Sequence, residues 1–136
     1  MPRVSRKPKE GNGMSDLRTI GTFSQAIIDL LGLNIVAGTP IYIGQENIDH
    51  MKARHPTEFE MYYDRIEEVI SEPDYVRNNT KNASIDFVKT FYFGSDHVQV
   101  SVRVDSTGRH FARTLFLLMS YKFERFVKDG TLVKPY

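Results

Sequence analysis

A change in the spacing of apolar residues near position 83 constrains the fold of this chain more than any other feature. From Ile85 to Val104, apolar residues recur at every second position on both sides of a turn at 94–96, with Lys89 as the exception. Alternation of this kind is typical of strands that bury one face, and a short turn with glycine is typical of a hairpin. A second turn at 105–108 leads to a third run. The sequence therefore predicts an antiparallel meander over residues 83–118.

Other segments have helical spacing. We expect helices from a Thr22–Gln25 capping box to Gly32, over 45–55, over 58–71, and from a Ser120 cap to Gly130. Short edge strands fit 40–43 and 131–136, and a loop fits 77–82. Together these elements predict an α+β domain, in which N-terminal helices pack on one face of a twisted antiparallel sheet of about four strands and a helix ends the chain. The other face of the sheet is expected to stay partly open.

The length of 136 residues, of which 40% are hydrophobic, fits one ordinary domain. We expect a single folded domain over 17–136 and a flexible basic tail over 1–16, because the tail has little apolar surface to bury. The absence of cysteine excludes disulfides, thiolate zinc sites and a cysteine nucleophile. No apolar run reaches the roughly 18 residues of a membrane span, and no secretion signal is recognisable, so we expect a cytoplasmic protein with no membrane partner.

Charge is distributed unevenly along the chain, although the net charge is only +1. Residues 46–76 hold nine acidic and three basic side chains, a balance of −6. Residues 97–136 hold seven basic and three acidic side chains, a balance of +4. The total charge therefore does not indicate a nucleic-acid partner, and the distribution matters more for partners than the total does.

Four short motifs follow one another in an order that resembles a known group of families. They are Ile-Asp-His-Met-Lys-Ala-Arg-His-Pro at 48–56, Pro-Asp-Tyr at 73–75, Ile85 to Lys89, and Lys-Phe-Glu-Arg-Phe-Val-Lys-Asp-Gly at 122–130. Their order and spacing, over about residues 41–134, resemble the phage-associated nucleases grouped under the barnase, EndoU, colicin and RelE fold. The resemblance implies one or two helices on a four-stranded antiparallel sheet, and metal-independent RNA cleavage in phage or bacterial conflict systems.

RNA cleavage of this type needs two proton transfers and positive charge. The 2′-hydroxyl attacks its own adjacent phosphorus, so a base must take its proton, an acid must protonate the departing 5′-oxygen, and cations must stabilise the transition state. Histidine suits either proton transfer. His55 is the first candidate, because it lies at a helix end ahead of Pro56 and can reach a cleft; the alternative is a structural histidine that locks the turn. His50 is the second candidate, with an exposed helix histidine as its alternative.

Lysine and arginine side chains are the candidates for phosphate binding. Lys89 stands on an otherwise apolar strand face, and we expect it to meet His55 at one concave site; the alternative is snorkelling at a sheet edge. Arg103 alternates with Gln99 and Ser101 on one strand face.

Either Arg113 or Thr114 lies opposite that face, depending on a hairpin register that the sequence does not fix; their alternatives are a surface ion pair and sheet propensity. Ser120 and Arg125 are further RNA-binding candidates, with a helix cap and a solvated side chain as the alternatives.

The remaining histidines and aromatics are given structural roles. His97 and His110 are interpreted as exposed residues at strand ends, and Phe91, Tyr92 and Phe93 as core residues rather than a base-stacking surface. Histidines five residues apart do not have the spacing of a zinc helix, so we expect no metal and no cofactor.

The sequence as a whole predicts a metal-independent endoribonuclease that leaves a 2′,3′-cyclic phosphate. RNA, with tRNA as one candidate, is the expected partner, together with an inhibitor or immunity protein. The resemblance implies a toxin-like or prophage conflict role in a bacterial host. The alternative is a non-catalytic RNA- or protein-binding module of a phage or mobile element.

Overall fold

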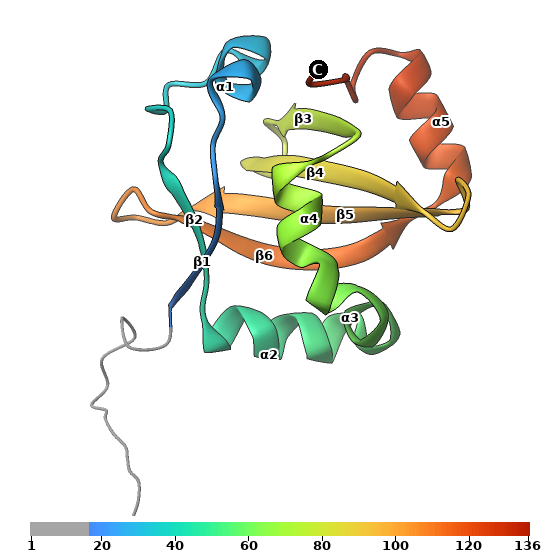
Figure 1. The fold of residues 1–136 in the computed structure, drawn as a ribbon, viewed down its shortest axis with the longest axis horizontal. Helices are drawn as coiled ribbons and strands as arrows, with labels where there is room; N and C mark the ends of the chain where they lie inside the picture. Colours follow the sequence, from blue (N-terminus) through green and yellow to red (C-terminus); the bar gives the residue numbers. More distant parts are fainter. Residues whose placement is uncertain (1–16) are drawn as a thin grey trace, which may run out of the picture.

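A computed structural model describes residues 17–136, and the expected basic tail over 1–16 lies outside the described residues. The centre of the fold is a six-stranded mixed sheet in the order β1-β2-β6-β5-β4-β3 (Figure 1). The strands are β1 (Arg18–Thr22), β2 (Pro40–Ile43), β3 (Tyr75–Asn79), β4 (Ser84–Phe91), β5 (Asp96–Val104) and β6 (His110–Leu118). The helices are α1 (Gln25–Leu31), α2 (Gln45–Arg54), α3 (Pro56–Tyr62), the 3-10 helix η3 (Tyr63–Arg65), α4 (Ile66–Ser71) and α5 (Ser120–Lys128).

Strands β4, β5 and β6 form the expected antiparallel meander. Every residue of β4 pairs with β5, and β5 pairs with β6 around one bulge next to Ser101. The α+β class and the meander over 83–118 are therefore confirmed.

The sheet has more strands than the roughly four predicted from the sequence, and it is mixed rather than purely antiparallel. Strand β3 pairs with β4 along its whole length and includes the start of the expected loop at 77–82. Strand β2 pairs antiparallel with β1 and parallel with β6, so it is an interior strand rather than an edge strand. The expected last strand at 131–136 is reduced to a single bridge between Val133 and Val76.

Two helix starts differ from the sequence expectation. Strand β1 extends through Thr22, so Ser24 caps α1, and its hydroxyl accepts a 3.3 Å hydrogen bond from the Ile27 backbone N–H. Met119, in extended conformation, takes the cap position of α5, and its carbonyl accepts the Phe123 N–H at 2.9 Å. Ser120 is therefore the first helical residue and not the cap.

The expected helix over 58–71 is broken into α3, η3 and α4. The break falls at Tyr62, whose backbone (φ −126°, ψ −4°) leaves the helical region. The Tyr62 ring is buried, and its hydroxyl donates a hydrogen bond to Asp96 at the start of β5. Burial, together with this hydrogen bond, raises the pKa of the Tyr62 hydroxyl. Figure 1 shows that α3 and α4 point in different directions as a result.

The two faces of the sheet are unlike, and we name them by what lies on them. Helix α4 lies across the covered face (Figure 1), where it contacts β1, β4 and β5. Gly21 of β1 allows this approach, because a Cβ atom there would lie 2.5 Å from Ile70 Cγ2. Strand side chains on the covered face include Ile85, Phe87, Lys89, Phe91, Val98, Val100, Val102, Leu115 and Leu117.

The opposite face, which we call the open face, carries a mixture of polar and aromatic side chains. They are Arg77 and Asn79 of β3, Ser84, Asp86, Val88 and Thr90 of β4, His97, Gln99, Ser101 and Arg103 of β5, and Thr114 and Phe116 of β6. Helix α5 packs against one end of this face through Phe123 and Phe126. No helix within residues 17–136 is long and apolar enough to cross a membrane.

Candidate active site on the open face

His55 lies between α2 and α3, beside β6. Its backbone N–H donates to the Met51 carbonyl and its carbonyl accepts from the Phe59 N–H, both at 2.9 Å. The imidazole stacks on Phe116, with ring centroids 5.6 Å apart and an interplanar angle of 30°. The side chain is 34% exposed. The backbone and Phe116 therefore hold His55 at the β6 edge of the open face, where solvent and substrate can reach it.

Glu58 gives His55 a carboxylate neighbour that the sequence analysis missed. Its Oε2 lies 3.6 Å from His55 Nδ1, which is beyond a hydrogen bond but suits an ion pair once the imidazole is protonated. The two residues are three apart, a spacing that places side chains on one helical face and could have indicated the pair. Because Nδ1 faces Glu58, Nε2 is the nitrogen left for a substrate.

A buried carboxylate, also missed from the sequence, organises the β3–β4 part of the open face. Asp86 is fully buried and accepts hydrogen bonds from Arg77 Nε at 2.7 Å, Ser84 Oγ at 2.8 Å and Asn79 Nδ2 at 3.2 Å. The Arg77 guanidinium lies 4.6 Å from the centre of the Phe126 ring of α5. The sequence feature that could have indicated this network is the position of Asp86, a charged residue between the apolar residues Ile85 and Phe87 of β4. This network satisfies the buried charge and ties α5 to the sheet.

His97 is buried on the open face rather than exposed at a strand end. Its ring stacks on Phe123 at 3.8 Å, and its Nδ1 lies 2.9 Å from Thr90 Oγ1. Burial lowers the pKa of His97, which favours the neutral imidazole. His110 is also buried, edge-on to Phe23 in the core, and burial lowers its pKa as well. Neither histidine has the accessibility of His55.

The register of β5 and β6 decides which of the predicted residues lie on the open face. Ser101 pairs with Thr114, so Thr114 lies on the open face, whereas Arg113 is the extra residue of the bulge and is exposed. Arg103 is exposed and shares the open face with Ser101 and Gln99, as the alternation predicted. Within residues 17–136, no carboxylate pairs with Arg103 or Arg113. Both guanidinium groups are therefore available to an anionic ligand.

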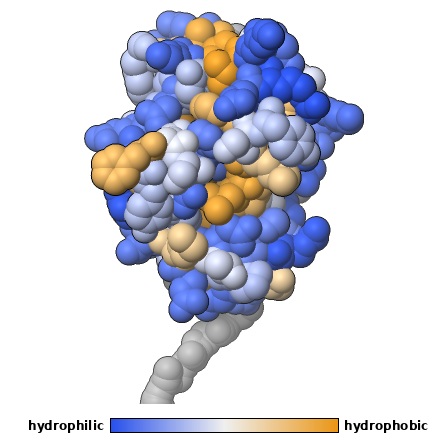
Figure 2. Space-filling view, turned by 90° about the vertical axis from the view of Figure 1, so that its right-hand side faces the viewer, coloured by the Kyte–Doolittle hydropathy of each residue, from blue (hydrophilic) through white to orange (hydrophobic). Residues whose placement is uncertain are grey.

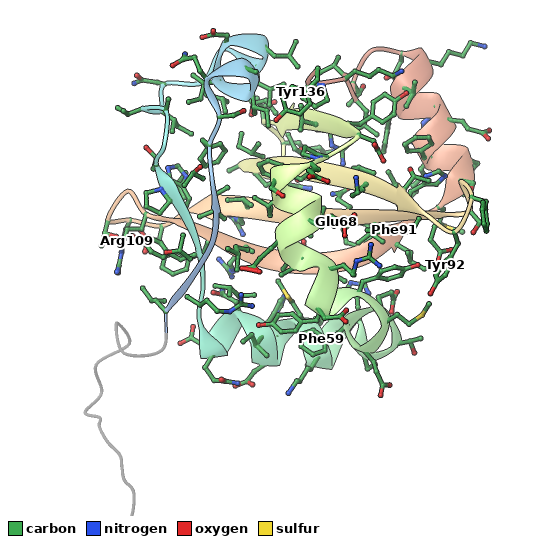
Figure 3. All side chains as sticks on the ribbon, in the orientation of Figure 1. Phe59, Glu68, Phe91, Tyr92, Arg109 and Tyr136 are labelled. Atoms are coloured by element: carbon green, nitrogen blue, oxygen red, sulfur yellow. The ribbon has the colours of Figure 1, made fainter. Side chains whose placement is uncertain are left out.

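Lys89 does not lie with His55. Its Nζ donates to the Glu72 carbonyl at 2.9 Å and lies 4.0 Å from Glu68 Oε2, so it is held by α4 on the covered face. The expectation that His55 and Lys89 meet at one site is wrong, because the strand directs Lys89 to the face opposite Phe116. Figure 3 shows Glu68 on α4, in front of the sheet.

The other predicted residues lie on α2 and α5. His50 is half-buried on α2, and no hydrogen bond or ion pair joins it to another residue of 17–136. Ser120 is exposed at the first position of α5. Arg125 is exposed on the same helix, with its guanidinium 5.2 Å from the centre of the Phe126 ring. Over the described range, no group of three or more His, Asp or Glu side chains has a metal-binding arrangement.

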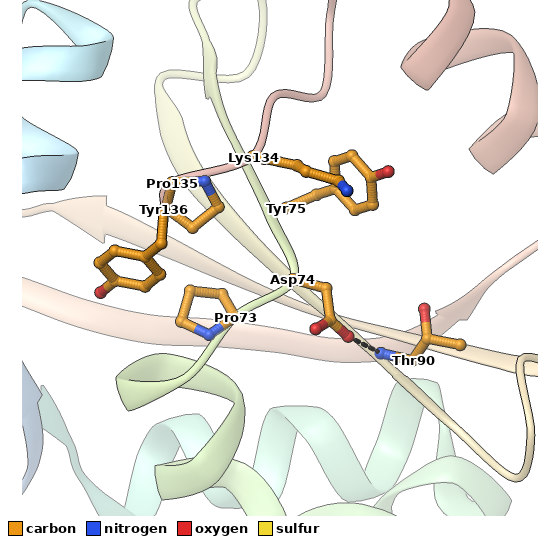
Figure 4. A pocket seen from close by; sticks show the side chains of 7 residues that line it. All are labelled: Pro73, Asp74, Tyr75, Thr90, Lys134, Pro135 and Tyr136. Atoms are coloured by element: carbon orange, nitrogen blue, oxygen red, sulfur yellow. Dashed lines mark hydrogen bonds between the residues drawn. The ribbon is translucent and has the colours of Figure 1, made fainter.

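A separate pocket of about 420 Å³ lies at the β3 edge and contains none of the predicted site residues (Figure 4). Asp74 accepts the Thr90 backbone N–H at 2.8 Å inside it, and Figure 4 shows Lys134 alongside the Tyr75 ring. The other lining residues are Pro73, Pro135 and Tyr136. Thr90 belongs both to this pocket and to the open face, where its hydroxyl lies within hydrogen-bond distance of His97 Nδ1.

Comparison with known proteins gives one family. The model of the family described as phage-Barnase-EndoU-ColicinE5/D-RelE like nuclease3 matches residues 18–124, which span β1 to the middle of α5. Searches of the curated proteins and of the solved structures each found no match. The chain belongs to the phage-Barnase-EndoU-ColicinE5/D-RelE like nuclease3 family.

Proposed function

We propose that this chain is an endoribonuclease that cleaves RNA at the open face without a divalent metal. The observation that carries the proposal is the position of His55, an accessible imidazole beside Glu58 and stacked on Phe116 at the edge of that face. Membership of a phage-associated nuclease family supports a nuclease role. Arg103 and Thr114, on the neighbouring strands, are the proposed contacts to the RNA backbone.

In the proposed reaction, His55 accepts the 2′-hydroxyl proton through Nε2. The 2′-oxygen then forms a bond to the adjacent phosphorus, and the bond from phosphorus to the 5′-oxygen breaks. The leaving oxygen takes a proton from a second group, for which His50 is the candidate, so the products are a 2′,3′-cyclic phosphate and a 5′-hydroxyl. The cation of Arg103 is the proposed partner of a neighbouring phosphate of the RNA, because Arg103 pairs with Phe111, five residues along β6 from Phe116.

The charge distribution supports an approach of RNA from the open side. The acidic segment 46–76 forms α2, α3 and α4, whereas the basic segment 97–136 forms β5, β6 and α5. A polyanion is attracted to the second group of elements and repelled by the first, so RNA would reach His55, which lies between α2 and α3, from the β6 side.

The biological part of the proposal rests on the family. We propose a toxin-like or prophage conflict role in the bacterial cytoplasm, with tRNA among the candidate substrates and an inhibitor or immunity protein as a partner. The word phage in the family description is what favours this role over a housekeeping one.

The test is incubation of the pure protein with total RNA in excess EDTA, followed by mass spectrometry of the fragments. We expect cleavage, with 3′ ends that are lighter than a linear phosphate by one water. A matched oligonucleotide with 2′-O-methyl groups should stay intact, because it lacks the attacking hydroxyl. Cleavage that requires added magnesium, or that also cuts the 2′-O-methyl strand, would contradict this mechanism.

A binding module without catalysis is the second candidate. The observation that favours it is Lys89, which α4 holds on the covered face, so that no lysine of the meander joins His55. If the protein binds RNA and leaves it uncut, the non-catalytic binding function replaces the proposed ribonuclease function.

A further inference from the structure

The pocket at the β3 edge is a fork between the start of β3 and the segment that follows α5. Val76 of β3 and Val133 of that segment run antiparallel and exchange backbone hydrogen bonds of 2.8 and 2.9 Å. The next rung of such a ladder would join Asp74 to Pro135. It cannot form, because proline has no N–H and the Asp74 N–H already donates to a carbonyl of β4. The two segments therefore part beyond the bridge and enclose about 420 Å³, which we call the β3 fork.

Two opposite charges line the β3 fork, and each keeps hydrogen-bonding capacity for a ligand. Asp74 Oδ2 accepts the Thr90 backbone N–H at 2.8 Å, and no residue of 17–136 bonds to Asp74 Oδ1. Lys134 forms no hydrogen bond or ion pair with any residue of the same range, Asp74 included. A fitting ligand therefore brings an N–H donor for Asp74 and an anionic group for Lys134.

The rest of the lining suits a flat ring. Figure 4 shows the Tyr136 ring and the Tyr75 ring on opposite sides of the opening. Pro73 and Pro135 line it on the Tyr136 side. The Tyr75 ring is held in place, because it packs edge-on against Phe123 of α5, with ring centroids 5.4 Å apart. Aromatic faces bind nucleobases by stacking, and the volume lies within the range of about 300–1,000 Å³ that is typical of small-molecule sites.

A nucleotide combines the features that this lining requires, because it has a flat base, an amino donor on some bases and a phosphate. An added peptide strand fits less well, since the outward backbone groups of Val76 already bond to Val133. A protein surface fits less well too. Figure 2 shows the apolar residues on the α5 side of the molecule in separate groups divided by hydrophilic surface, whereas the centre of a protein interface is apolar and poor in charge.

We propose that the β3 fork binds one nucleotide whose base carries an amino group. The amino group donates to Asp74, the base stacks on the Tyr75 ring, and the phosphate lies at Lys134. The fork is separate from the proposed cleavage site, because β4 and β5 lie between β3 and the β6 strand beside His55. The inference therefore goes beyond the proposed function and does not depend on it. The nucleotide is either free or one unit of an RNA chain, and the test separates these two sources.

Calorimetric titration of the wild type with CMP and with UMP is the first measurement. At position 4 of the base, CMP has an amino donor where UMP has a carbonyl acceptor, and a carboxylate accepts from the first and repels the second. We expect CMP to bind about 5- to 15-fold more tightly than UMP, the contribution of one hydrogen bond to a charged acceptor at a partly exposed site.

Two folded variants assign this preference to the fork. Asp74→Asn keeps an acceptor for the Thr90 N–H and turns an amide donor toward the ligand, so the preference for CMP should disappear or reverse. Lys134→Met should weaken CMP roughly 2- to 5-fold and leave cytidine, which has no phosphate, unchanged. Lys81→Met is the matched control, because Lys81 is exposed in the turn at the other end of β3, and it should bind both nucleotides like the wild type.

Short 2′-O-methyl oligonucleotides of C and of U separate the two sources, because they lack the hydroxyl that the proposed cleavage needs. If they show the preference for C and Asp74→Asn removes it, the fork holds a nucleotide of an RNA chain. If only CMP shows the preference, the ligand is a free nucleotide. The inference is overturned if the wild type prefers C over U in neither form, or if Asp74→Asn keeps the preference of the wild type.

Discussion

The two faces of the sheet differ in how they are stabilised and in what they leave exposed. On the covered face, α4 lies over a nearly continuous apolar surface, and Lys89 within that surface is held by α4 itself. On the open face, Asp86 and its three donors occupy the β3–β4 part, α5 covers one end, and His55 and Arg103 remain accessible. The charged side chain of Lys89, on an apolar strand face, binds the helix that covers that face. The candidate site residues instead lie on the face where polar side chains recur at every second strand position.

The largest stability effect is expected from a cavity on the covered face. Phe87 is fully buried, with its ring centre 6.1 Å from that of Phe23, and Phe87→Ala should lower the free energy of unfolding by about 3–5 kcal/mol. Urea unfolding measures this loss. Phe116→Ala, a half-buried phenylalanine on the open face, is the matched comparison and should lose clearly less stability. Equal losses of unfolding free energy in the two variants would contradict the claim that the covered face contributes more to stability than the open face.

A smaller effect is expected from the polar network of the open face. Asp86→Asn keeps the shape of the side chain but removes the charge that Arg77, Ser84 and Asn79 bind, so the free energy of unfolding should fall by roughly 1.5–3 kcal/mol. Asp64→Asn is the control on an exposed aspartate and should stay within about 0.5 kcal/mol of the wild type. An Asp86→Asn protein as stable as this control would show that the network is not needed for the fold.

Acid should destabilise the protein through one buried histidine near each face. Burial lowers the pKa of His97 and of His110 from the ordinary value of 6.5. Below about pH 6.5 the unfolded chain therefore binds protons that the folded chain does not, so the free energy of unfolding falls as the pH decreases toward the folded pKa values. Above that pH, this contribution is complete and constant.

Urea unfolding at a series of pH values from 7.5 downward measures this loss. The double variant His97→Gln and His110→Leu should lose less stability in acid than the wild type. An identical dependence in both proteins would show that other groups cause it.

The parts of the fold that follow from local pattern could be predicted from the sequence. Alternation over 85–104 was enough for the meander, because one face of it is buried. The break at Tyr62 could not be predicted, since its hydrogen-bond partner, Asp96, is 34 residues away. Strand β3 could not be predicted for the same reason. Arg77 and Asn79 have the polar character of a loop, and their partner Asp86 lies on the neighbouring strand.

The candidate site was predictable to a similar degree. The face of Arg103 followed from alternation, but the choice of Thr114 over Arg113 depended on a bulge of one residue. The alternation also extended the strand too far: Tyr92 and Phe93 continue the pattern, yet both adopt positive φ and form the turn. A sequence pattern does not show where a strand stops being paired.

A paired assay of His55→Ala and Lys89→Met tests the central claim that the open face, and not the covered face, carries the chemistry. Both proteins are first shown to be folded, and cleavage of RNA in EDTA is then measured alongside the wild type. The account predicts that His55→Ala lowers the rate about 10²- to 10⁴-fold, the usual share of one acid or base, while Lys89→Met cuts RNA at nearly the wild-type rate. A folded His55→Ala protein with full activity, or a folded Lys89→Met protein with none, would contradict it.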